Sequence, residues 1–324
     1  MRIGWIAGLA LFVALVVDHG AREIGGRLAF AGMGLLWIPV LHLVPLAASA
    51  LGWRAVLGRT AQLPRRTFLR ARWIAESINQ LLPALQLGGN LVRAQIASRC
   101  GVPGPLAGAS VVVDITLHLL AQLVFALLGL GLLLVHLEAR ELVGPVVVGL
   151  VATAGTVAAF YVVQRRGVFG PLARRLARVV RSSEWASLSA GAEAMDGWIG
   201  RLYSDGRAIR VSLVWHVLSW VLGASEIWLA LHLLGHPVPL AAAIVLESLA
   251  EAIRTAAFAV PGALGVQEGG FVLLGNVYGF GPELSIALSL TKRFRELCLG
   301  IPGLVVWQLE GAARAGTRRA TAER

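Results

Sequence analysis

Residues 106–135 read LAGASVVVDITLHLLAQLVFALLGLGLLLV, a long apolar run in which Asp114 is the sole charged residue. About 20 consecutive apolar residues are enough for a helix to cross the hydrocarbon core of a bilayer, which is ~30 Å thick. The run therefore predicts a transmembrane helix. Similar runs recur along the 324-residue chain and are separated by short arginine-rich pieces. This pattern predicts an all-α polytopic integral membrane protein.

The composition excludes the other broad classes of protein. Hydrophobic residues make up 57% of the chain and charged residues 15%, against about a quarter charged in soluble domains. The mean hydropathy is +0.73. A β-barrel would show strands of ~10 residues with alternating polarity. A disordered or collagen-like chain would contain far fewer leucine, valine and isoleucine residues.

The basic residues point to membrane topology and lipid contacts. All but one of the 29 basic residues are arginine, the exception being Lys292, and the net charge is +11. The arginines cluster between the apolar runs, where they set the orientation and attract anionic lipid headgroups. No nucleic-acid recognition motif accompanies them. Cys100 and Cys298 lie far apart without a Cys-x-x-Cys motif, so we expect no disulfide, no metal site and no cofactor.

Six apolar runs predict transmembrane helices. The first, at 3–17, is expected to be retained because no small-x-small cleavage site follows it. The second contains Pro39 and Pro45, which predict a kink. The other five predicted spans are 28–52, 106–135, 143–163, 211–234 and 284–308.

Two further apolar segments are interrupted and predict re-entrant helical hairpins. Residues 73–99 are broken by proline and glycine into two pieces, each too short to cross the bilayer, and residues 240–280 repeat the pattern. Such breaks are tolerated at membrane depth where protein or a water-filled cavity covers the backbone. The predicted breaks are Pro83, Gly88 and Gly89 in the first hairpin and Pro261, Gly262, Gly269 and Gly270 in the second.

The order of elements predicts an inverted repeat. Helix, helix, hairpin and helix occur twice, at about 1–136 and 143–310, and an odd number of crossings in each half inverts the second copy. Transporters of this kind bind their substrate near such paired breaks. The single membrane domain spans 1–324, with a basic loop at 164–210 and a basic tail at 311–324. The arginine distribution predicts a bacterial inner-membrane protein with both termini in the cytoplasm.

Charged and polar residues inside the apolar segments are the candidate functional residues. An ionisable group in the bilayer costs at least ~2.5–3.5 kcal/mol. One interpretation is that these residues form ion pairs that hold the helices together. Because apolar replacements of such pairs are often harmless, a polar cavity explains so many charges better. The predicted substrate pathway consists of Glu76, Asn79, Asp114, His118, Glu251, Arg254, Glu268, Lys292, Arg293, Arg295 and Glu296.

Three blocks of the sequence resemble a known family. They are RARWIAESINQLLPALQLGGNLVRAQ at 70–95, ASVVVDITLHLLAQ at 109–122, and the segment from EAIRTAAFAVPGALGVQEGG to SLTKRFRELCLGIPGL at 251–304. They resemble the lysylphosphatidylglycerol synthase transmembrane-domain or flippase-like family, and within it the hopanoid-biosynthesis-associated membrane proteins called HpnL. In better-understood relatives this module moves an aminoacylated phospholipid between leaflets while a separate domain attaches the amino acid. Because only a short tail follows Trp307, the resemblance implies a transport or accessory role without synthesis.

The leading hypothesis is an inner-membrane lipid translocase without enzymatic activity, whose substrate is a hopanoid or an aminoacyl or anionic phospholipid. The alternatives are a small-solute or ion-coupled secondary transporter, a membrane enzyme acting on a lipid phosphate, and a non-catalytic accessory protein of hopanoid biosynthesis. The sequence leaves open the lipid, the direction and energy source of transport, and the oligomeric state.

Overall fold

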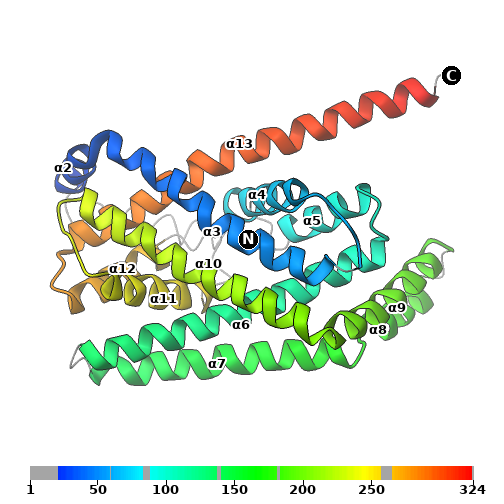
Figure 1. Cartoon of the computed structure of the whole chain (residues 1–324), viewed down its shortest axis with the longest axis horizontal. Helices are drawn as coiled ribbons and strands as arrows, with labels where there is room; N and C mark the ends of the chain where they lie inside the picture. Colours follow the sequence, from blue (N-terminus) through cyan, green and yellow to red (C-terminus); the bar gives the residue numbers. More distant parts are fainter. Residues whose placement is uncertain are drawn as a thin grey trace.

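The computed structural model describes residues 21–58, 60–82, 88–136, 140–180, 183–256 and 265–322. Within these ranges the regular structure is helical and contains no strand, which confirms the all-α prediction. The helices run mostly along one long axis, as Figure 1 shows. Pro83, Pro261 and Gly262, three of the predicted hairpin breaks, and the first predicted span at 3–17 lie outside the described residues.

The described part of the chain is an ordered series of helices with one 3-10 turn. In chain order they are α2 (Ala21–Ala31), the 3-10 helix η1 (Gly32–Leu36), α3 (Trp37–Leu57), α4 (Arg65–Leu81), α5 (Gly88–Arg99), α6 (Gly104–His136), α7 (Arg140–Arg165), α8 (Phe169–Val180), α9 (Ser183–Ser204), α10 (Gly206–Leu233), α11 (Leu240–Ala256), α12 (Val266–Val277) and α13 (Pro282–Ala322).

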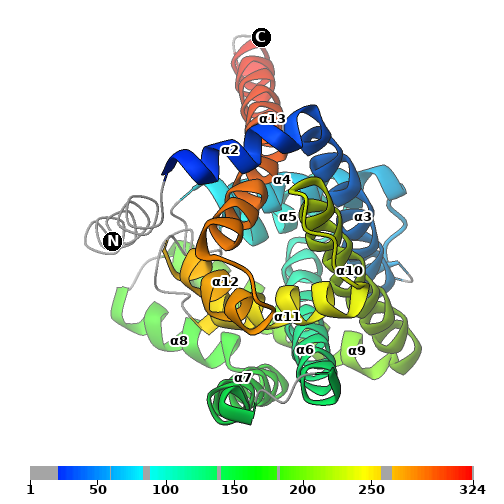
Figure 2. The same ribbon diagram turned by 90° about the vertical axis from the view of Figure 1, so that its left-hand side faces the viewer.

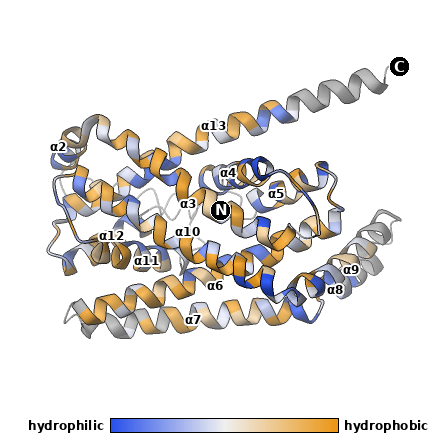
Figure 3. Ribbon diagram, in the orientation of Figure 1, coloured by the Kyte–Doolittle hydropathy of each residue, from blue (hydrophilic) through white to orange (hydrophobic). Residues whose placement is uncertain are grey.

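Among the described residues, three stretches of helix are long and apolar enough to cross a membrane. They are Arg22–Leu57, Gly104–Val135 and Gly206–Leu233, which contain most of the predicted spans at 28–52, 106–135 and 211–234. Apolar residues dominate α3, α6 and α10 in Figure 3. Large apolar side chains on these helices, such as Trp37 and Val135, are exposed. Exposed apolar surface of this kind suits contact with lipid.

The prolines of α3 do not interrupt it. Pro39 lies in the first turn, where a missing N–H is tolerated, and Pro45 lies within the helix. The irregular segment is instead the 3-10 helix η1, which begins at Gly32 with a φ of 49°. The hydroxyl of Ser219 on α10 donates to the carbonyl oxygen of Pro45 at 2.7 Å, so α10 packs closely on α3 at this point.

Two pairs of short helices correspond to the predicted hairpins. Helices α4 and α11 have 17 residues each, and α5 and α12 have 12. At ~1.5 Å per residue, they reach about 26 Å and about 18 Å, less than the thickness of the hydrocarbon core. Helix α4 packs on α5, and α11 packs on α12. Figure 2 looks along the long axis and shows α11 and α12 near the end that faces the viewer.

The first hairpin needs glycine at Gly89. A Cβ atom there would overlap the carbonyl oxygen of Ala75 on α4, and the Gly89 N–H donates to the Asn79 side chain at 2.9 Å. In the second hairpin α12 begins directly after Gly265, whose φ is 76°, so the predicted breaks at Gly269 and Gly270 lie inside this helix. A Cβ on Gly269 would meet nothing within 4 Å, and one on Gly270 would make ordinary contact with Ile253. The two Gly-Gly pairs therefore differ in their steric role.

This difference predicts opposite outcomes for a matched pair of variants. Gly89→Ala should lower the free energy of unfolding by about 1–3 kcal/mol, because α5 must move away from α4. Gly269→Ala should be neutral or stabilise the protein by up to ~1 kcal/mol, because alanine is the better helix former. Thermal unfolding of the detergent-solubilised protein measures both. Equal effects of the two substitutions would contradict the close approach at Gly89.

The arginine-rich connections lie toward one end of the molecule. In Figure 1 the last turn of α3, the start of α10 and helices α8 and α9 all lie toward the right. The turns at 234–239 and 278–281, toward the other end, contain no arginine. Helices α8 and α9 lie in the segment predicted as the basic loop at 164–210, and α9 packs on α6. Burial raises the pKa of the Tyr203 hydroxyl, which donates to Gln164 of α7 at 2.9 Å.

Candidate functional site

A layer of buried polar residues separates two apolar cores. On α3, His42 lies between Ile38 of one core and Ala50 of the other. A polar residue also separates the two cores on α6, where His118 lies between Leu117 and Ala126, with the cores in the opposite chain order. On α13 the charged stretch 292–296 lies between Leu288 and Leu304. Because these helices run along the long axis, the charges gather between the two apolar cores. A membrane protein that served only as an anchor would gain nothing from burying charge there.

His42 of α3 joins two carboxylates from different helices. Its Nδ1 lies 2.5 Å from Oε1 of Glu226 on α10, and its Nε2 lies 2.7 Å from Oε1 of Glu76 on α4. Ionised carboxylates only accept hydrogen bonds, so both ring nitrogens must carry a proton when both carboxylates are ionised. Otherwise one carboxyl group holds that proton. In either arrangement His42, Glu76 and Glu226 share one proton in addition to the single N–H of a neutral imidazole.

Arg295 of α13 completes this group. Its Nη1 lies 3.0 Å from each ring nitrogen of His42 and 3.6 Å from Oε1 of Glu76, and its Nε lies 3.4 Å from Oε2 of Glu226. Helices α3, α4, α10 and α13 therefore meet at a single cluster of two carboxylates, one imidazole and one guanidinium. Glu76 is the most exposed of the four, with 18% of its side chain accessible.

The charges continue from α13 into the second hairpin. Glu296 lies 3.7 Å from Arg254 of α11, 3.2 Å from Arg293 and 3.7 Å from Arg295. Arg254 also faces Glu251 on its own helix at 3.6 Å, and Arg293 faces Glu268 of α12 at 3.4 Å. Apart from the 3.2 Å contact between Arg293 and Glu296, these ion pairs are longer than tight hydrogen bonds. They form a connected but loosely paired network between the two hairpins.

Two further pairs are tighter. The ammonium of Lys292 on α13 donates to both carboxylate oxygens of Glu247 on α11, at 2.8 and 2.7 Å, and it lies over the ring of Phe271. Glu268 caps the start of α12 by accepting from the Gly265 N–H at 2.7 Å and from Ser289 at 3.0 Å. These contacts fix the second hairpin against α13.

A second polar cluster centres on Asp114 of α6. Its Oδ2 accepts from Nη1 of Arg93 on α5 at 2.6 Å, and its Oδ1 lies 2.8 Å from Nε2 of His216 on α10. His216 fits there because it faces Gly52, where a Cβ would come within 2.8 Å of its ring. His118 lies 3.3 Å from His216 and stacks on Trp220. Gln122 continues the stripe and donates to Thr255 of α11 at 2.6 Å.

Arg93 corrects one assignment made from the sequence. It was not among the predicted pathway residues, whereas its side chain is 0% exposed and paired with Asp114. The close packing of α5 on α4 at Gly89 carries Arg93 inward, and the partner carboxylate neutralises it there. It therefore belongs with the buried cations of the two clusters.

The structure brings most of the predicted pathway residues into these two clusters. Asn79 is different because its side chain accepts the Gly89 N–H and so holds the first hairpin together. His42 was missed by sequence reasoning. Its signal was weak, a single histidine between two prolines in an apolar run. Other residues of the clusters that were not among the predicted pathway residues are Arg93, His216, Glu226 and Glu247.

Several buried guanidinium nitrogens have no hydrogen-bond partner within the described ranges. They include Nε and Nη2 of Arg93 and Nη2 of Arg293. A buried unpaired donor costs about 1–3 kcal/mol, so such groups are rare unless they serve a function. These nitrogens can donate to a polar or anionic group that enters the layer.

The fold and its charged layer define a helical membrane protein with ionisable groups buried between two apolar cores. The chain belongs to the family described as the lysylphosphatidylglycerol synthase TM region, whose model matches residues 3–303. The match covers nearly the whole chain and confirms the family resemblance seen in the three sequence blocks. A comparison with curated proteins finds no match.

Proposed function

We propose that the protein is a lipid translocase of the bacterial inner membrane, in which the polar headgroup crosses through the charged layer while the apolar tail stays in lipid. The observation that carries the proposal is the position of the layer, which lies between two apolar cores and is formed by both hairpins together with α3, α10 and α13. Family membership agrees with a role in lipid handling.

The energetic argument concerns the headgroup. Even one charge at the centre of a bilayer costs at least about 2.5–3.5 kcal/mol, so unassisted crossing of a charged headgroup is slow. A layer with both signs of charge offers partners to a zwitterionic, anionic or aminoacylated headgroup. The loose pairs of Glu296 with Arg254 and Arg295 are the groups best able to exchange partners.

The proposed topology has six transmembrane helices and two re-entrant hairpins in an inverted repeat, with both termini in the cytoplasm. It is supported by the shortness of α4, α5, α11 and α12 and by the arginine-rich connections toward one end. Rocking of one repeat against the other would expose the layer to each leaflet in turn. Arg295 contacts Glu76 of the first hairpin, and Glu296 contacts Arg254 of the second. The two repeats would therefore move relative to one another about this part of α13.

The proposed substrate is a hopanoid with a polar side chain or an aminoacyl or anionic phospholipid. The hopanoid option comes from the resemblance to the HpnL proteins, and the phospholipid option from the family. Anionic lipids also neutralise the exposed arginines at the arginine-rich end. The proposal assigns no chemical step to these residues.

A second candidate is an ion-coupled transporter of a small solute. The observation that favours it is the close contact of His42 with both Glu76 and Glu226, which makes these three side chains a candidate proton-coupling site. The two candidates differ in whether leaflet movement of a lipid occurs at all. Proton coupling is compatible with either.

Leaflet movement of lipids in proteoliposomes tests the proposal. Fluorescent and native lipids, including a hopanoid, should equilibrate between leaflets with the wild type. Lys292→Ala and Arg254→Ala should slow this movement roughly ten-fold or more, because Lys292→Ala removes the ammonium that pairs with Glu247 and Arg254→Ala removes the guanidinium between Glu251 and Glu296. Arg70→Ala, which breaks an exposed pair with Glu310, is the matched control. If no lipid moves between leaflets, with or without a proton gradient, the translocase proposal is wrong and the solute-transporter and accessory hypotheses are favoured.

A further inference from the structure

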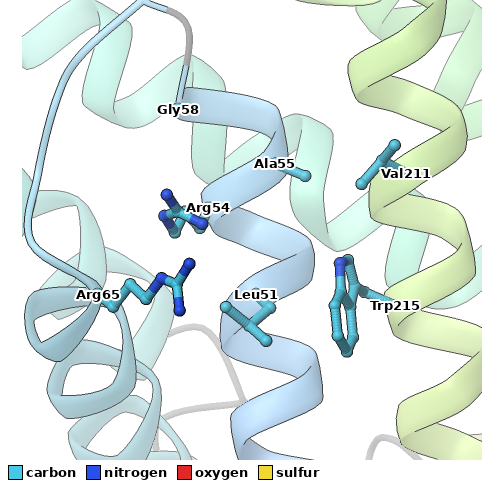
Figure 4. A pocket seen from close by; sticks show the side chains of 7 residues that line it. All are labelled: Leu51, Arg54, Ala55, Gly58, Arg65, Val211 and Trp215. Carbon is cyan, nitrogen blue, oxygen red and sulfur yellow. The ribbon is translucent and has the colours of Figure 1, made fainter.

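A hollow lies at the arginine-rich end of the molecule, outside the charged layer. It has a volume of about 400 Å³ and lies among α3, the start of α4 and the start of α10. Pockets of ~300–1,000 Å³ are typical of small-molecule sites. Figure 4 shows the lining residues, which are Leu51, Arg54, Ala55, Gly58, Arg65, Val211 and Trp215.

Two guanidinium groups face the hollow from different helices. Arg54 lies in the last turn of α3 and Arg65 is the first residue of α4. Figure 4 shows their side chains extending toward one another. Over the described ranges, no carboxylate forms an ion pair with either arginine. Two like charges held together repel each other, and an anion between them removes this repulsion.

The start of α4 adds a second source of positive potential. Its N-cap residue is Pro64, and no side chain caps the helix. The first N–H groups of a helix have no intrahelical partner and carry a partial positive charge, which favours phosphate and carboxylate. The N–H of Arg65 is one of these groups, so the helix end and the two guanidinium groups lie at the same place.

The opposite wall is apolar. Val211 and Trp215 of α10 lie across α3 from the two arginines in Figure 4, and Val211 is 41% exposed. Tryptophan is enriched at the membrane–water interface, where one face of the ring contacts acyl chains. Cations on one side and an exposed apolar wall on the other match an amphiphile with an anionic head. A free phosphate ion would contact only the side of the hollow that carries Arg54 and Arg65.

We infer that this hollow binds the phosphate headgroup of an anionic membrane lipid, with the acyl chains along Val211 and Trp215. The inference does not depend on translocation, because it concerns binding at one interface. If translocation occurs, the hollow lies where a lipid of the arginine-rich leaflet would meet the protein before reaching the charged layer.

Quenching of Trp215 fluorescence tests the inference. The full-length protein is placed in phosphatidylcholine vesicles that contain brominated phosphatidylglycerol or, separately, brominated phosphatidylcholine. The signal of Trp215 is the difference between the wild type and Trp215→Phe. The phosphatidylglycerol probe should reach half-maximal quenching at a mole fraction roughly ten- to thirty-fold lower than the phosphatidylcholine probe. Each cation near the surface strengthens the binding of an anionic lipid about five-fold, and two arginines line the hollow.

The arginine dependence separates a site from general surface attraction. Arg54→Gln with Arg65→Gln should abolish the preference for phosphatidylglycerol. Arg66→Gln with Arg99→Gln, which removes two exposed charges outside the hollow, should preserve it. Circular dichroism and gel filtration verify that all variants are folded. Equal loss in both double variants would overturn the inference, and so would relief of quenching by millimolar inorganic phosphate, which would indicate a free-anion site.

Discussion

Asp114→Ala is expected to lower the free energy of unfolding by about 3–5 kcal/mol, because it leaves a fully buried guanidinium without its counter-charge. Arg93 is 0% exposed and pairs with Asp114 at 2.6 Å, and His216 holds the other carboxylate oxygen at 2.8 Å. Removal of Asp114 therefore affects α5, α6 and α10 together. Denaturant unfolding in detergent micelles measures the loss.

Two comparisons make this result specific. Arg70→Ala breaks an ion pair whose arginine is 41% exposed and should cost less than about 1 kcal/mol. Replacement of both partners, Arg93→Met with Asp114→Leu, should recover most of the stability, because no charge remains buried. If Asp114→Ala costs no more than Arg70→Ala, the buried pair does not contribute to the fold as described.

His42→Gln is expected to slow lipid movement roughly ten-fold or more and to remove its dependence on pH between about 5 and 8, the range in which histidine groups titrate. Glutamine retains hydrogen-bonding capacity but cannot take up the proton shared with Glu76 and Glu226. Two carboxylates would then face each other with Arg295 as the nearby cation. Initial rates in proteoliposomes across this pH range measure both effects.

The control for His42 is another histidine outside the layer. His232 on α10 is exposed, and its ring contacts the carbonyl oxygen of Trp228 on the same helix. His232→Gln should leave the rate and the pH profile unchanged. A full rate and an unaltered pH profile in His42→Gln would exclude the His42 group as a proton site and return it to a structural role.

The sequence predicted an all-α protein and where the charges concentrate, but not that the basic loop at 164–210 contains α8 and α9 or that α13 continues through the basic tail to Ala322. A charge within an apolar run is costly enough to stand out, which is why Arg254, Lys292 and Arg295 were predicted and do lie in the network. The shortness of the segments also predicted short helices here, but Gly89 lies within α5, and Gly269 and Gly270 lie within α12 rather than at a break.

Which side chains pair with one another could not be predicted in the same way. His42 is neutral by default and isolated in its run, so its position between Glu76 and Glu226 depends on how α3, α4 and α10 pack. Arg93 lies in the middle of the short helix α5, and its burial reflects the close contact of α5 with α4. Both depend on tertiary contacts that helical periodicity does not encode.

The central claim is that a lipid headgroup enters the layer between the two apolar cores. Photo-crosslinking with a lipid that carries a reactive group on its headgroup, followed by peptide mapping, tests it most directly. We expect adducts on α4, α11 and α13, near Glu76, Arg254 and Arg295, which excess unlabelled lipid reduces. Adducts confined to the exposed apolar surface, at residues such as Trp37 and Val135, would contradict passage of the headgroup through the layer.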